Sequence, residues 1–169
     1  MGIVSKKLAV ILLAVWFIWG FCPQMSLESQ AEGHEHDSIT FEVWNTTNQL
    51  PANAGNYYLN TDVTLSDTWT VPAGTTNLCL NGHGIIQSAA SKRVIQVNSG
   101  STLNIYDCDT TTEYKYSINT NHLAEIKNDG DKTFTGGYIT GGSGEEGAGI
   151  YVNKGAFAIY GGNSNYSVA

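Results

Sequence analysis

Two histidines early in the chain have the spacing of a metal-binding pair. His34 and His36 flank Glu35 in the stretch HEHD. If a leader is removed after Ala31, His34 becomes the third residue of the new chain. A free amine, two backbone amides and an imidazole at that position chelate Cu²⁺ or Ni²⁺. The sequence therefore predicts a metal site at His34 and His36, and the alternative interpretation is an ordinary polar leader.

Three tyrosines are the other candidates for binding. Tyr106, Tyr151 and Tyr160 each fall between the apolar positions of a short strand-like run, so their rings should point outward. A row of exposed rings on a sheet offers a platform on which sugars can stack. We therefore predict carbohydrate binding at these tyrosines, with packing beneath loops as the alternative.

The sequence shows no clustered set of residues of the kind that a catalytic site needs. A polysaccharide lyase needs clustered carboxylates for calcium and a basic residue that takes a proton. The only arginine is Arg93, and no patterned carboxylates lie near it in sequence. The stretch GGSGEE at 141–146 is one imperfect copy of a calcium-binding repeat that acts in tandem. We predict no catalytic residue and no cofactor, and interpret as turn residues the acidic pairs Asp107/Asp109, Asp129/Asp131 and Glu145/Glu146.

The N-terminal segment has the layout of a secretory signal peptide. Lys6 and Lys7 precede an apolar run over 8–21, and a small-x-small triplet ends at Ala31. This pattern predicts cleavage after residue 31 and an extracellular protein, secreted or on the cell surface. The alternative is an uncleaved membrane anchor.

The negative net charge of the chain disfavours negatively charged binding partners. The chain carries a formal charge of −7, which disfavours nucleic acid and anionic membrane surfaces. We expect no nucleic-acid partner and no membrane contact after the signal peptide is removed.

The pattern of residues in the rest of the chain predicts short strands separated by turns. Apolar residues alternate with polar ones, as at Leu78/Leu80 and Leu103/Ile105, which is typical of strands with one buried face. When TNLCL is aligned with STLNI, Leu78 falls on Leu103, which gives a repeat period of about 25 residues. The stretch IQVNSG aligns with IYVNKG at about twice that period. Such repeats predict a solenoid. We predict an all-β, right-handed parallel β-helix, with a β-sandwich as the alternative.

The repeat also predicts the distance between the two cysteines that follow the leader, Cys79 and Cys108. In this alignment Cys79 lies beside Asn104, so Cys108 is about 13 Å further along the strand. A disulfide needs α-carbons within about 7 Å. We predict two unbonded thiols, unless a bulge at Asp107 turns Cys108 back.

Several stretches of the sequence resemble the repeats of a known protein family. The stretches LPANAGNYYLNTDVTLSDTWTVPAGTTNLCLNGHGI, VIQVNSGSTLNIYDC and GAGIYVNKGAFAIYGG are similar to bacterial cell-surface β-helix repeat proteins, which are adhesin-like and share the pectate-lyase-like fold. The resemblance implies a leader and capping segment over 32–56. It implies coils over 57–169 that are cut off at the C-terminus and belong to a longer array.

The resemblance implies a non-enzymatic adhesin or stalk that contacts carbohydrate or a host surface protein. The alternative is the N-terminal part of a polysaccharide lyase or glycoside hydrolase whose catalytic coils lie beyond residue 169.

Overall fold

The computed structural model describes residues 34–120, 124–142 and 149–160, which belong to one compact unit, Gly33–Ala169. In this part of the chain the regular elements are all strands. No helix among the described residues is long and apolar enough to cross a membrane. The predicted signal peptide lies outside the described residues.

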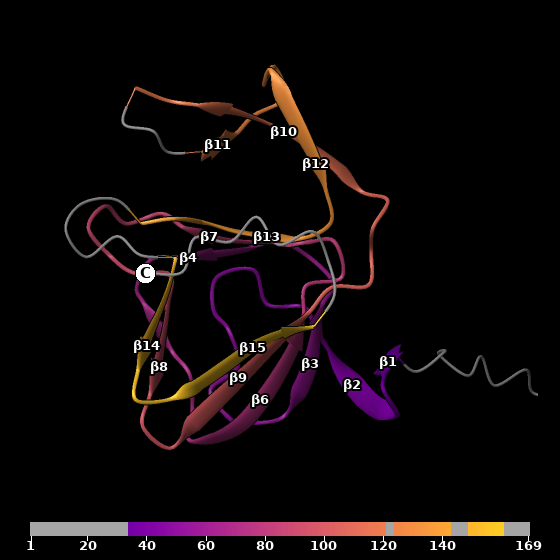
Figure 1. Cartoon of the computed structure of the whole chain (residues 1–169), viewed down its shortest axis with the longest axis vertical. Coiled ribbons are helices and arrows are strands. Elements are labelled where there is room, and N and C mark those ends of the chain that lie inside the picture. The colour runs from indigo at the N-terminus through magenta and orange to yellow at the C-terminus, as the bar shows by residue number, and fades with distance from the viewer. Residues whose placement is uncertain (1–33, 121–123, 143–148, 161–169) are drawn as a thin grey trace, which may run out of the picture. The chain divides into compact units, whose positions relative to one another are not determined.

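The strands form four sheets (Figure 1). A six-stranded sheet has the order β1-β2-β3-β6-β9-β15, and the three-stranded sheets have the orders β13-β7-β4, β14-β8-β5 and β11-β10-β12. The strand bounds are β1 His34–His36, β2 Ile39–Trp44, β3 Asn56–Leu59, β4 Val63–Leu65, β5 Trp69–Thr70, β6 Gly74–Cys79, β7 Gly84–Gln87, β8 Ile95–Asn98, β9 Ser101–Tyr106, β10 Glu113–Ile118, β11 Ala124–Ile126, β12 Lys132–Thr135, β13 Tyr138–Gly141, β14 Ile150–Asn153 and β15 Ala156–Tyr160.

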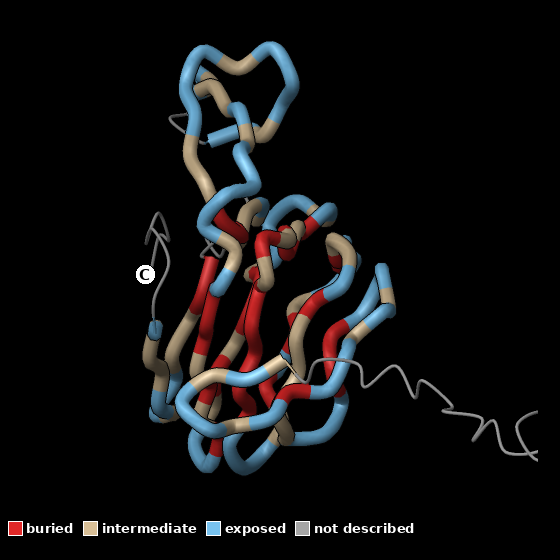
Figure 2. Tube along the Cα trace, turned by 90° about the vertical axis from the view of Figure 1, so that its right-hand side faces the viewer, coloured by how far each residue is buried: buried red, intermediate tan, exposed pale blue. Residues whose placement is uncertain are grey.

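Three of the sheets supply side chains to one apolar core. Leu78 and Leu103 come from the six-stranded sheet, Ile85 from β7 and Val97 from β8, and all four are fully buried. The buried positions run along neighbouring strands (Figure 2). Burying an aliphatic side chain of this size contributes about 1.5–3 kcal/mol, so the core is the main source of stability.

The prediction of a right-handed parallel β-helix is wrong. The fold is all-β, but its sheets are mixed, several are short, and the largest curls into a half-barrel (Figure 1). Parallel ladders join β3, β6, β9 and β15. By contrast, β1 pairs antiparallel with β2, and β10 pairs antiparallel with both β11 and β12.

Turn geometry explains the antiparallel pairing. Asp37 and Ser38 join β1 to β2 with φ values of 49° and 67°, and two successive positive φ angles are characteristic of the tight turn in a two-residue hairpin. The connection between β10 and β11 is also short. Parallel strands need a crossover of about a dozen residues or more, so these segments return as hairpins.

The predicted period is wrong by two residues between β6 and β9. Leu78 pairs with Ile105, and Leu103 pairs with Thr76. Because side chains alternate with a period of two, a two-residue shift keeps the same residues on the buried face. The apolar pattern therefore could not distinguish the two registers.

The stretches IQVNSG and IYVNKG pair in the register of the predicted alignment, but without the intervening coil that the alignment predicted. Ile150 pairs with Ile95 and Val152 with Val97, so the two strands are direct neighbours rather than two coils apart. The sheet of β10, β11 and β12 forms from the chain between them.

One hydroxyl ties this separate sheet to the rest of the unit. The hydroxyl of Tyr114 on β10 donates to the carbonyl oxygen of Gly82 at 2.7 Å. Tyr114→Phe should lower the free energy of unfolding by about 0.5–1.5 kcal/mol, the usual net value of one hydrogen bond. Urea denaturation measures the change. Tyr116→Phe is the matched control, and equal losses in both variants would contradict the assignment.

Candidate metal centre

A hairpin covers part of the outer face of the six-stranded sheet. Leu78 and Leu80 point into the main core, so Cys79 between them points outward. There it joins a second buried cluster with Phe41 and Tyr106. The hairpin of β1 and β2 supplies Phe41 and both histidines, which places polar side chains over a buried thiol.

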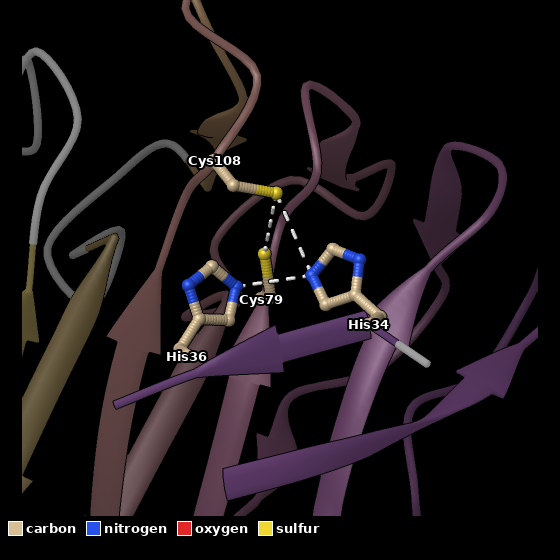
Figure 3. Close-up of side chains that lie close together, drawn as sticks. All are labelled: His34, His36, Cys79 and Cys108. Atoms are coloured by element: carbon tan, nitrogen blue, oxygen red, sulfur yellow. Dashed lines mark hydrogen bonds between the residues drawn. The ribbon is translucent and has the colours of Figure 1, made fainter. Parts of the chain in front are cut away.

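Four ligand atoms converge beside this hairpin (Figure 3). They belong to His34, His36, Cys79 and Cys108, and all lie within 4.8 Å of one another. The Nε2 atoms of the two histidines are 3.0 Å apart. The Sγ atom of Cys108 lies 3.6 Å from Sγ of Cys79 and 3.5 Å from Nε2 of His34.

These separations resemble those around a tetrahedral metal ion. With zinc–sulfur bonds of about 2.3 Å and zinc–nitrogen bonds of about 2.0–2.1 Å, tetrahedral angles separate two sulfurs by about 3.8 Å. The same geometry separates sulfur from nitrogen by about 3.5 Å and two nitrogens by about 3.3 Å. Three observed separations, 3.6, 3.5 and 3.0 Å, are close to these values, and every pair of ligand atoms lies within 4.8 Å. Shifts of about 1 Å would therefore let the four side chains hold such an ion.

Aromatic rings hold the two imidazoles in place. The ring of His34 stacks on Tyr58 at 4.3 Å with an angle of 8° between the planes. The ring of His36 stacks on Tyr106 at 5.1 Å, and Phe41 meets both imidazoles edge-on. Since each imidazole has a packed partner, the nitrogen atoms are already oriented toward the thiols.

The surroundings favour neutral histidines and protonated free thiols. Burial, and then the neighbouring His36, lower the pKa of His34. Burial also lowers the pKa of His36, against the opposing effect of Asp37 and Asp107. Burial raises the pKa of both cysteine thiols. Neutral imidazole is the form that binds metal, whereas a metal must displace the thiol protons to bind sulfur.

The site is open on one side. Cys79 is buried, the two histidines are half-buried and Cys108 is exposed. Cys108 also lies 3.4 Å from the side-chain oxygen of Asn81. A metal ion or a small reagent can therefore reach the centre by way of Cys108.

The predicted metal residues His34 and His36 do come together, but with partners that were not predicted. The amino-terminal arrangement for copper or nickel depends on residues 32 and 33, which lie outside the described residues. The two cysteines are unbonded, yet the predicted separation of about 13 Å is wrong, because Cys79 pairs with Tyr106 rather than with Asn104.

The three predicted carbohydrate-binding tyrosines do not form one exposed row. Tyr106 is buried under the hairpin, and Tyr160 stacks on it at 4.9 Å with 47% of its surface exposed. Tyr151 lies in another sheet, on β14, where Arg93 sits 4.0 Å from its ring centre. The structure thus divides these side chains between two surfaces.

Three members of the predicted acidic pairs, Asp107, Asp109 and Asp131, have structural partners. Asp107 accepts backbone hydrogen bonds from Gly82 and Gly137. Asp109 accepts bonds from Thr111 and Thr112 within its own turn. Asp131 pairs with Lys132, and Glu145 and Glu146 lie outside the described residues. Within the described ranges, only the two histidines and two cysteines form a group suited to a metal ion.

Sequence reasoning missed the cysteines as metal ligands. Their separation in the chain gave no familiar metal-binding spacing, and the two-residue error in register moved them apart. The usable signal was the residue count, since two cysteines and two neighbouring histidines follow the predicted leader. Comparison with protein-family models, curated proteins and solved structures found no match in any of the three.

Proposed function

We propose that this chain binds one zinc ion through His34, His36, Cys79 and Cys108. The observation that carries the proposal is the convergence of two imidazole nitrogens and two sulfurs within 4.8 Å. These ligands come from three separate segments of the chain: β1, β6 and the residues just after β9. A set of two nitrogens and two sulfurs in tetrahedral arrangement is characteristic of zinc.

The proposed ion has a structural role. Four protein ligands complete a tetrahedral shell, whereas a catalytic zinc keeps one position for water or substrate. In this arrangement the ion fastens the hairpin to the outer face of the sheet. β1 has three residues and pairs only with β2, and β2 is joined to β3 only through Glu42–Trp44. The hairpin therefore gains most from the crosslink.

This role fits the predicted extracellular, non-enzymatic protein. A metal crosslink contributes folding free energy to the segments that supply its ligands. Secretion, cell-surface location and contact with carbohydrate or a host protein stay predictions.

The test is a zinc titration of the reduced full-length chain. We expect one zinc ion per chain, and a cobalt-substituted protein with the absorption bands of tetrahedral thiolate coordination. Cys79→Ser, Cys108→Ser and His36→Ala should each weaken binding by more than the roughly 10–100-fold caused by losing an outer hydrogen-bonding partner.

Two matched variants control the experiment. His83→Ala removes a histidine that pairs with Asp62, and Cys22→Ser removes a cysteine outside the described residues. Both should bind zinc normally. Binding that survives the substitution of both Cys79 and Cys108 would contradict the proposal and favour a site formed by the two histidines without the cysteines.

A further inference from the structure

We infer that Cys79 and Cys108 form a reversible disulfide and that this disulfide and the metal ion exclude each other. The inference makes the thiol pair a site of oxidative modification. Its first part stands on the geometry of the two sulfurs alone, whereas the exclusion of the ion rests on the proposed function.

The two sulfurs are already in contact. Their separation is 3.6 Å, and a disulfide bond is about 2.05 Å long, so closure needs a movement of about 1.6 Å. Cys79 is held in the middle of the sheet, between β3 and β9. Cys108 follows the end of β9 and is exposed, so its side chain can make this movement without disturbing the ladder.

Unequal exposure sets the order of the chemical steps. The oxidant is a low-molecular-weight disulfide such as glutathione disulfide. The exposed Cys108 attacks one of its sulfurs, which forms a mixed disulfide and releases one thiolate. The buried Cys79 then attacks Sγ of Cys108, breaks the mixed disulfide and releases the second thiolate.

The exchange is balanced in electrons, protons and charge. Two cysteine sulfurs are oxidised to one disulfide while the small disulfide is reduced to two thiols. In the metal-free protein the two cysteine protons end on the released thiols. In the zinc-bound protein the cysteines are thiolates, so the zinc ion departs as Zn²⁺ and the released thiolates take protons from water.

Loss of the ion follows from the ligand count. A disulfide removes both thiolates and leaves only the imidazoles of His34 and His36. Thiolates dominate the affinity of such sites for zinc. Oxidation therefore releases the ion, and reduction restores the complete set of four ligands.

The test uses the full-length chain carrying Cys22→Ser, so that only Cys79 and Cys108 react. Zinc-bound and zinc-free samples are treated with glutathione disulfide. Free thiols, intact mass and zinc captured by a chromogenic chelator are then measured. We expect both thiols to disappear, the mass of the chain to fall by two hydrogens, and one zinc ion to be released per disulfide. Dithiothreitol should restore both thiols and zinc binding.

Single variants test the order of the steps. With Cys79→Ser the exposed Cys108 should retain one glutathione as a stable adduct. With Cys108→Ser the buried Cys79 should react at least tenfold more slowly. Equal adduct formation in the two variants would overturn the proposed order.

The outcomes separate this inference from the proposed function. Zinc-free protein that forms no intramolecular disulfide overturns the inference while zinc binding stands. Oxidised protein that binds zinc as tightly as reduced protein overturns mutual exclusion. Reduced protein that forms the disulfide but never binds zinc overturns the proposed function, and the exclusion with it.

Discussion

Removing zinc with a chelator should lower the free energy of unfolding by about 4 kcal/mol relative to protein held at a free zinc concentration one thousand times the dissociation constant. The ion binds the folded site, where four ligands converge, more tightly than the unfolded chain. Urea denaturation in zinc-buffered solutions measures the difference, which should grow linearly with the logarithm of free zinc.

The variant Cys79→Ser supplies the matched comparison. It removes one ligand from the buried side of the site, so its stability should respond much less to zinc than that of the parent protein. His83→Ala should respond like the parent protein, because His83 lies outside the four-ligand group. An equal zinc response in Cys79→Ser and the parent would contradict a site at Cys79.

Asp107→Ala should lower the free energy of unfolding by about 2–6 kcal/mol, since it leaves two buried backbone donors unsatisfied at about 1–3 kcal/mol each. The side chain of Asp107 is buried and accepts from the backbone nitrogens of Gly82 at 2.9 Å and Gly137 at 2.6 Å. It thus joins the turn after β6 to the start of β13.

Urea denaturation in the presence of a chelator isolates this effect from metal binding. Asp107→Asn keeps one oxygen acceptor and should lose less stability than Asp107→Ala. Asp131→Ala is the control on the exposed surface and should change stability little, because its partner Lys132 is also exposed. Similar losses for Asp107→Ala and Asp131→Ala would contradict the structural role of Asp107.

Local pattern predicted the strands well. The alternation at Leu78/Leu80 and Ile95/Val97 identified side chains that are fully buried. The alignment of IQVNSG with IYVNKG also gave the correct register, since Ile150 pairs with Ile95 and Val152 with Val97. Both results follow from the two-residue period of side chains along a strand, because this period can be observed in the amino-acid sequence itself.

Pairing between strands was less predictable. The apolar pattern allowed Leu78 to lie beside either Leu103 or Ile105, because both choices bury the same face. The parallel β-helix prediction failed for a related reason. It extended one repeat through the chain, while the turn at Asp37 and Ser38 and the short connection between β10 and β11 directed those strands into antiparallel pairs.

By itself the sequence determined an all-strand chain, the identity of its apolar faces and a pair of histidines with metal-binding potential. Only the tertiary structure decided that Cys79 and Cys108 meet His34 and His36. The physical reason is that the site depends on strand register and on the fold of one hairpin over a sheet. Both are set by contacts between segments far apart in the chain, and a shift of two residues moves a side chain by about 6–7 Å.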